Sequence, residues 1–221
     1  MRKPFPIFFL FVLASCLDES SVPPAQPSTF IRYYNGGFND AAVSFAETSD
    51  KGFIILSTLS FKANSDTLSY KIKLIRTDAF GNPLWTRLYP PNFKTVSTGE
   101  VARQDINYKA KSLQILSDGG YVITGEDIQK DLTAKILLMR VDANGANQII
   151  ASLPASSAGV TNNSVSGQAL GLNATGNFLV LSTSGATDMV LGEMGKDFTS
   201  SNTTFAWKNK YDAGTTSLAN R

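Results

Sequence analysis

Carboxylates are the side chains with which this sequence could most readily do chemistry, because it lacks the histidine and has few of the cysteines on which many catalytic sites depend. The chain contains no histidine, and Cys16 is its one cysteine. A Ser-His-Asp triad, a histidine general base and a histidine-ligated metal therefore cannot be built from it. An enzyme of this composition would have to use carboxylates, Lys, Tyr or Ser, which leaves glycoside hydrolysis by paired acids as the catalytic possibility.

The acids do not form an obvious catalytic pair. Glu126 and Asp127 are adjacent, and Glu47 and Glu193 are separate candidates. A glycosidase needs two carboxyl groups about 5 to 10 Å apart across the sugar. Neighbours in an extended strand point to opposite faces, so Glu126 and Asp127 should not meet. We therefore expect no enzymatic activity and no catalytic residue, with a histidine-free carboxylate glycoside hydrolase as the alternative.

Three aspartates, Asp78, Asp142 and Asp197, each precede a polar corner of the sequence. One carboxylate per corner is too few for calcium, which takes six to eight oxygen ligands. An aspartate at a tight turn instead accepts hydrogen bonds from the turn's own backbone. We expect turn capping at these positions, no metal site and no cofactor.

Ligand binding is expected in the segments that interrupt the regular pattern, at 61–70, 89–107 and 153–164. Loops on a rigid scaffold commonly hold binding residues. The middle segment supplies the candidates Phe93, Lys94 and Arg103, although it could equally be a solvated connector. Two tryptophans could stack on sugars, but their repeated position favours packing between sheets; they are Trp85 and Trp207.

One sequence motif occurs three times, and it predicts the strands and turns that position these residues. It reads TSDKGFIILST from Thr48, LSDGGYVITG from Leu116 and NATGNFLVLST from Asn173. Each copy joins two strand-like runs through a polar turn, which is the pattern of a β-hairpin. A second hairpin follows each, so we expect units of four antiparallel strands at about 35–89, 100–153 and 160–211, with a further unit beginning at 212–221.

The predicted strands are apolar on both faces. Ile72 and Leu74 fall on one face of a predicted strand, while Ile75 falls on the other. A sheet covered on both sides has this composition. Four-stranded meanders packed face to face are the blades of a β-propeller, which typically has 4 to 8 of them. We therefore expect an all-β, propeller-like domain over 29–221, in an incomplete ring of about three blades. The chain would be a fragment, with an open half-ring as the alternative, and 29–34 (TFIRYY) would be an outer strand of the kind that pairs with the final blade.

The N-terminus reads as an export signal over 1–15. Arg2 and Lys3 precede an apolar run that is too short for a membrane-spanning helix of about 20 residues. LASC at 13–16 resembles the lipobox of bacterial lipoproteins, which implies a lipidated Cys16 and a proline-containing tether over 16–28. The alternative is an ordinary signal peptide cut near Ala14.

Two further motifs resemble those of a known class of protein. SDKGFIILST with LIRTDAFGNPLW, and SDGGYVITGE with MRVDANGANQI, resemble repeats of bacterial surface lipoproteins with β-propeller-type repeats. Asp18 and Glu19, directly after Cys16, resemble the export signal of surface lipoproteins in the Bacteroidota; a polar tether is the alternative. The resemblance implies a lipid-anchored protein of the bacterial cell envelope, at the outer membrane or cell surface.

The distribution of charge along the chain indicates which class of molecule it could bind. Arg2 and Lys3 account for the net charge of +2, so the rest of the chain is neutral and shows no basic stripe. Nucleic acid is therefore not an expected partner. We expect a membrane-anchored binding or scaffold module for a polysaccharide, peptide or protein, with a purely structural repeat as a further alternative.

Overall fold

The computed structural model describes residues 30–35, 37–62, 68–90, 107–161, 163–185, 188–199 and 204–212. The chain divides into two units, residues 1–30 and 31–221. Every strand of the described residues belongs to the second unit. No helix in this described part is long and apolar enough to cross a bilayer.

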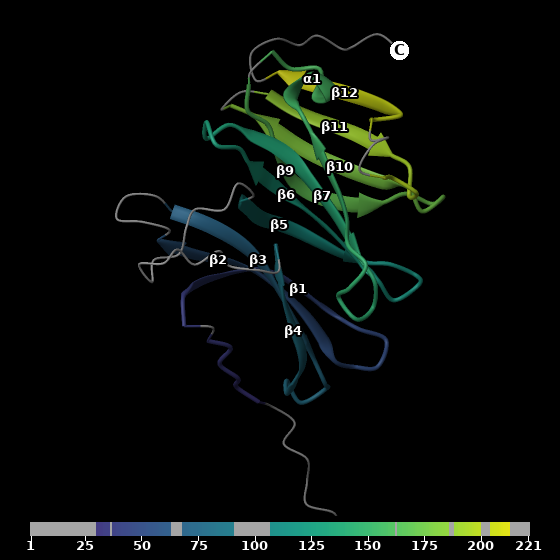
Figure 1. Cartoon of the computed structure of the whole chain (residues 1–221). Helices are drawn as coiled ribbons and strands as arrows, with labels where there is room; N and C mark the ends of the chain where they lie inside the picture. Colours follow the sequence, from purple (N-terminus) through teal and green to yellow (C-terminus); the bar gives the residue numbers. More distant parts are fainter. Residues whose placement is uncertain are drawn as a thin grey trace, which may run out of the picture. The chain divides into compact units, whose positions relative to one another are not determined.

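The strands form three four-stranded antiparallel sheets, each a meander in chain order (Figure 1). The first sheet contains β1 (Asn39–Glu47), β2 (Phe53–Lys62), β3 (Leu68–Thr77) and β4 (Pro83–Tyr89). The second contains β5 (Asn107–Ile115), β6 (Tyr121–Ile128), β7 (Ala134–Val141) and β8 (Ile149–Leu153). The third contains β9 (Ser166–Leu172), β10 (Phe178–Ser184), β11 (Asp188–Met194) and β12 (Trp207–Asp212). The predicted all-β fold of three four-stranded units is confirmed.

The first turn of each sheet explains why one sequence motif occurs three times, because the three turns share one structure. In all three turns the same two backbone hydrogen bonds close the corner, as from Leu116 N–H to the Gly120 carbonyl at 2.8 Å. One residue per turn has a positive φ: Lys51 at 66°, Gly119 at 80° and Gly176 at 82°. Glycine adopts this left-handed conformation without steric cost, whereas Lys51 must accept it.

A β-bulge in the first strand of each sheet follows the same repeat. The register between the first two strands shifts once, leaving Val43, Lys111 and Gln168 as the extra residues. A bulge bends the strand and increases its twist. Beside the second bulge, a Cβ on Gly125 would overlap the carbonyl oxygen of Lys109, so the two backbones can approach only at a glycine.

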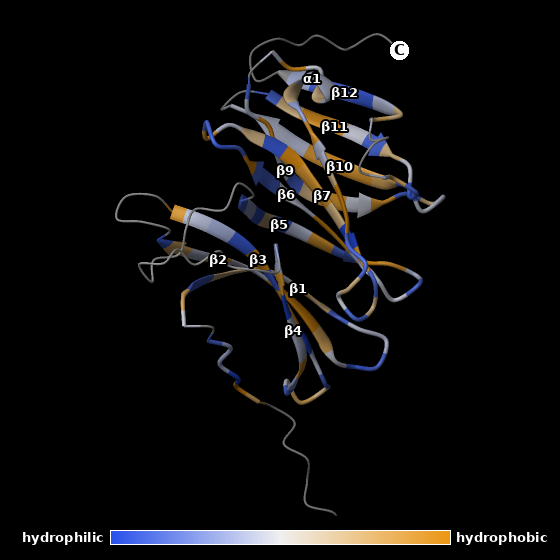
Figure 2. Cartoon of the chain, in the orientation of Figure 1, coloured by the Kyte–Doolittle hydropathy of each residue, from blue (hydrophilic) through white to orange (hydrophobic). Residues whose placement is uncertain are grey.

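Two apolar cores hold the three sheets together. The first and second sheets share a core in which Ile54, Leu56, Ile72 and Leu74 meet Leu113, Ile123, Leu137 and Met139. The second and third sheets share another, in which Val122, Ile136 and Leu138 meet Leu170, Val180 and Val190. The second sheet is therefore buried on both faces, and apolar residues recur along β7, β10 and β11 (Figure 2).

The prediction of an outer strand at the N-terminus is wrong for residues 30–34, which form no strand. Side chains attach this segment to the turn between β3 and β4 instead. The Tyr34 hydroxyl donates to the Gly81 carbonyl at 2.8 Å, and Arg32 donates to the Asn82 side chain at 3.2 Å. A turn offers no row of backbone partners, so the segment cannot extend a sheet.

The segment 153–164 is also not the open loop that the sequence suggested. It forms the short helix α1 (Ala155–Ala158), whose Ala155 and Ala158 join the core between the second and third sheets. Gly159 ends the helix with φ 72°. Small apolar residues in this segment were the available sign that part of it packs into a core.

The close approach at Gly125 gives a direct test of the sheet geometry. We expect Gly125→Ala to lower the free energy of unfolding by about 2 kcal/mol or more, because the methyl group must displace backbone. Gly195→Ala is the matched control, since no atom lies within 4 Å of its added Cβ. Urea unfolding of both variants measures the difference; equal stabilities would contradict the geometry.

Candidate functional site

The predicted ligand-binding residues Phe93, Lys94 and Arg103 lie outside the described residues, as does Cys16. Of the segment 61–70, the described residues belong to β2 and β3. The search for a site therefore turns to the ends of the sheets, where the turns converge.

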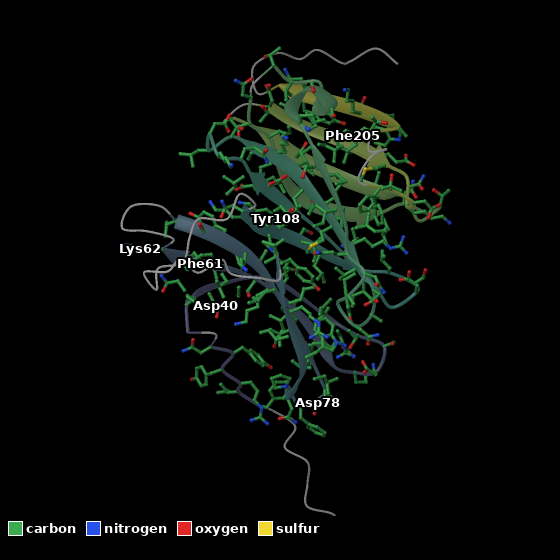
Figure 3. All side chains as sticks on the ribbon, viewed as in Figure 1. Asp40, Phe61, Lys62, Asp78, Tyr108 and Phe205 are labelled. Carbon is green, nitrogen blue, oxygen red and sulfur yellow. The ribbon has the colours of Figure 1, made fainter. Side chains whose placement is uncertain are left out.

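Asp78 and Asp142 cap the second hairpins of their sheets as predicted, whereas Asp197, the third predicted cap, makes no such bond among the described residues. The carboxylate of Asp78, which Figure 3 labels, accepts from the backbone N–H groups of Phe80 and Asn82, both at 2.8 Å. Asp142 accepts in the same way from Asn144 and Ala146, at 2.9 and 2.8 Å. The pKa of Asp78 is lowered first by the hydrogen bond from the Asn82 side-chain amide, at 2.8 Å, and then by that from the Asn82 N–H, whereas the pKa of Asp142 is lowered first by the Ala146 N–H. Within the described ranges, no three acidic, His or Cys residues gather into a group that could hold a metal ion.

Glu126 and Asp127 point to opposite faces of the second sheet, as predicted. Glu126 accepts from the Ser166 hydroxyl of the third sheet at 2.9 Å and lies 3.4 Å from the Lys111 ammonium. Asp127 accepts from Ser152 on β8. Each acid is used in a separate structural contact, so the two do not form a catalytic pair.

The first-hairpin aspartates pair with arginines of the third strand. Asp118 binds Arg140 at 2.7 Å, and Asp50 forms the equivalent pair with Arg76. The pKa of Asp50 falls to about 2, chiefly through the hydrogen bond from the Thr48 hydroxyl and then that from Arg76. Sequence reasoning identified these aspartates as turn residues but missed their arginine partners, although the repeated Arg-x-Asp pattern marks them.

Each pair borders a cleft between successive sheets. The cleft between the first and second sheets has a volume of about 470 Å³ and is lined by Asp50, Arg76, Ser117 and Tyr121. The cleft between the second and third sheets has a volume of about 430 Å³ and is lined by Asp118, Arg140, Asn173, Lys196 and Asp197. The clefts thus repeat with the fold.

The two clefts differ in the exposed fraction of their arginine side chain. The Arg76 side chain is 9% exposed, whereas that of Arg140 is 30% exposed. Arg140 also donates to the Lys196 carbonyl at 3.3 Å. The cleft between the second and third sheets therefore presents a guanidinium, an ammonium, an amide and carboxylates to solvent, a set that suits a hydroxyl-rich ligand.

In the third sheet a carboxylate replaces the arginine. Glu193 stands at the position of Arg140 and accepts from the side chains of Asn177 at 2.7 Å, Trp207 and Asn173 at 2.9 Å. These donors, Asn177 first, lower the pKa of Glu193. The third sheet thus has a carboxylate with neutral donors where the first two sheets have an ion pair, and both arrangements join the third strand to the first turn.

The two tryptophans differ in how far they are packed against other residues. Trp85 packs against the core of the first two sheets and meets Tyr121 edge-on, with ring centroids 6.1 Å apart. The prediction of packing is confirmed for Trp85. Trp207 is 40% exposed on β12, so packing between sheets is wrong for Trp207 in this structure.

Sequence reasoning missed two buried cations on β3. Lys71 is 1% exposed and donates to the Pro90 carbonyl at 2.9 Å, and Lys73 is 5% exposed and binds Asp40 at 2.9 Å. Burial lowers the pKa of Lys71 from 10.5 to about 8. The K-x-K spacing in an apolar strand was the available signal, because it places both side chains on one face.

The lowered pKa of Lys71 predicts an unusual pH dependence. Between pH 8 and about pH 9.5 the unfolded chain retains a proton that folded Lys71 has released, so stability should rise with pH. We expect a gain of about 1 kcal/mol in the free energy of unfolding. Urea titrations across this range should show the rise in the wild-type chain and not in Lys71→Met; parallel curves would contradict it.

No protein-family model, curated protein or solved structure matches the chain.

Proposed function

We propose that the chain is a lipid-anchored surface protein whose propeller-type repeat domain binds a polysaccharide. The binding site is the cleft between the second and third sheets. The observation that supports this best is the convergence there of Arg140, Lys196 and Asn173, from two different sheets, in an open cleft of about 430 Å³. The repeated sheets hold the cleft in shape, and the side chains that line the cleft contact the polysaccharide.

The strand arrangement supports a propeller-type frame. In a propeller, four-stranded meanders pack face to face around a central channel. Here β5 packs beside β1 and β9 beside β5, so the first strands of successive sheets are neighbours. The sheets themselves pack through extended apolar faces.

The chemistry of the cleft favours binding over hydrolysis. A glycosidase needs a general acid whose pKa is raised so that it stays protonated near neutral pH. Asp118 lines the cleft, but its pKa is lowered, first by the Gly120 N–H and then by Arg140. Asp118 is therefore ionised at neutral pH and accepts hydrogen bonds, as ligand hydroxyl groups require.

Binding of a glycan panel to the immobilised chain tests the proposal. We expect at least one polysaccharide to bind, and Arg140→Gln to weaken that binding about tenfold or more, because a charged hydrogen bond is lost. Titration calorimetry with the selected glycan measures the change.

A matched arginine variant and a product assay complete this experiment. Arg87→Gln removes an exposed arginine that stacks on Trp85 and should leave binding unchanged. Binding of peptides but no glycan, or equal losses in both variants, would contradict the site. Release of reducing sugar from the bound glycan would replace the binding function by hydrolysis.

The anchor is tested separately from the cleft. Metabolic labelling with a palmitate analogue in a bacterial host should mark the wild-type chain, and Cys16→Ala should abolish the label. The double variant Asp18→Asn with Glu19→Gln keeps Cys16 and should remain labelled. Equal labelling of wild type and Cys16→Ala would disprove lipidation at this residue.

A further inference from the structure

Three charged side chains gather on β5 and β6, away from the clefts. The set consists of Lys109, Lys111 and Glu126 and is called the lysine site below. The Glu126 carboxylate lies 3.9 Å from the Lys109 ammonium and 3.4 Å from the Lys111 ammonium. The clefts are lined at the other end of β6, by Tyr121 or the turn before it. Glu126 follows Tyr121 by five residues in an extended strand, a distance of about 16 Å.

A β-bulge residue and the cross-strand pair beside it occupy equivalent places in the three sheets. The lysine site fills these places in the second sheet, with Lys111 as the bulge residue. The first sheet has uncharged residues there, namely Val43, Ala41 and Thr58. The third sheet has polar but uncharged residues there, namely Gln168, Ser166 and Thr183. Uncharged residues are thus enough for the bulge to form, so the fold does not require the charges of the second sheet.

The lysine site has one more positive charge than negative charge and is open to solvent. Two ammonium groups lie near one carboxylate, and both distances exceed the roughly 2.8 Å of a close charged hydrogen bond. The side chains of Lys109 and Lys111 are 33% and 35% exposed, whereas that of Glu126 is 16% exposed. A ligand therefore meets the two cations before it meets the carboxylate.

Contacts from the first and third sheets fix the lysine site. The Lys109 ammonium lies 4.1 Å from the centre of the Tyr70 ring on β3, which is a cation–π contact. The Ser166 hydroxyl on β9 donates to Glu126 at 2.9 Å. The Gln168 amide in turn donates to the Ser166 hydroxyl at 3.0 Å. The two cations are therefore bordered by hydroxyl and amide groups that are held in place.

We propose that the lysine site binds the anionic group of an acidic sugar, a carboxylate or a sulfate ester with one negative charge. One negative charge balances the site, whereas a phosphate monoester, with about two, would be repelled by Glu126. The side-chain oxygen atoms of Ser166 and Gln168 can accept hydrogen bonds from the sugar hydroxyls beside the anion. The lysine site is separate from the cleft and does not depend on the polysaccharide proposed to bind there.

Titration calorimetry of the full chain tests the proposal with a galacturonic acid trimer, its methyl ester and a sulfated galactose trimer. We expect an anionic trimer to bind and the neutral ester to bind at least about tenfold more weakly, because charged hydrogen bonds are lost. The anionic trimer that binds more tightly identifies the group as carboxylate or sulfate. No binding of either anionic trimer, equal binding of the ester, or equally tight binding of a glutamate tripeptide would overturn the proposal.

A double variant removes both cations while keeping residues that the repeat already tolerates. Lys109→Ala with Lys111→Val gives the second sheet the residues of the first sheet at these positions. It should bind the anionic trimer about tenfold more weakly or worse, with thermal unfolding close to that of the wild type.

Two single variants outside the lysine site are the controls. Lys51→Gln changes a lysine whose side chain is 80% exposed, in the turn between β1 and β2, and should leave binding unchanged. Arg140→Gln belongs to the cleft and should also leave it unchanged. A loss in Arg140→Gln alone would place the acidic sugar in the cleft and overturn the lysine site, and equal losses in Lys51→Gln and the double variant would overturn it as well.

Glu126→Gln tests the charge balance without removing a lysine. The amide oxygen can still accept from Ser166, while the net charge of the site rises from one positive to two. The affinity for the anionic trimer should rise about fivefold, because the repulsion between Glu126 and the anion is lost. Lysines that served only the ion pair with Glu126 would give no such gain, so unchanged or weaker binding would contradict the proposal.

Discussion

Apolar packing between sheets is the constraint on which this structure depends. Each four-stranded sheet is a strip too narrow to bury anything by itself, and a few strands are stable only when a face is covered. The second sheet has both faces covered, with Ile136 and Leu138 on one side and Leu137 and Met139 on the other. The sheets repeat because each one depends on a neighbouring sheet to bury its apolar face.

The repeated turns follow from that packing. A sheet can be covered only if its strands keep their register, since a slip of one residue exchanges its two faces. The hydrogen bonds that Asp78 and Asp142 accept from backbone N–H groups, and the ion pair between Asp118 and Arg140, fix the corners that set this register. These polar and recurrent residues therefore hold the scaffold in place.

The sequence predicted what local interactions decide, namely strands, hairpins and capped turns. It failed where a distant neighbour decides. Residues 30–34 have strand-like composition, but their contacts are to a turn. Trp207 matches Trp85 in position, yet no described sheet covers it. Lys71 lies in an apolar strand, and only the folded chain brings the Pro90 carbonyl to its ammonium. The cleft residues come from two sheets, so no single segment could show them together.

The two equivalent arginines show where function can arise on such a frame. Arg76 and Arg140 occupy equivalent positions, in LIRTDAFG and LMRVDANG, and pair with the equivalent aspartates Asp50 and Asp118, so the turn alone would give them similar exposure. Their side chains are nevertheless 9% and 30% exposed, because different sheets lie against them. The ion pair belongs to the repeat, whereas the exposure of the guanidinium depends on the neighbouring sheet. A repeat protein can thus keep a structural residue at every position and make one copy of it available to a ligand.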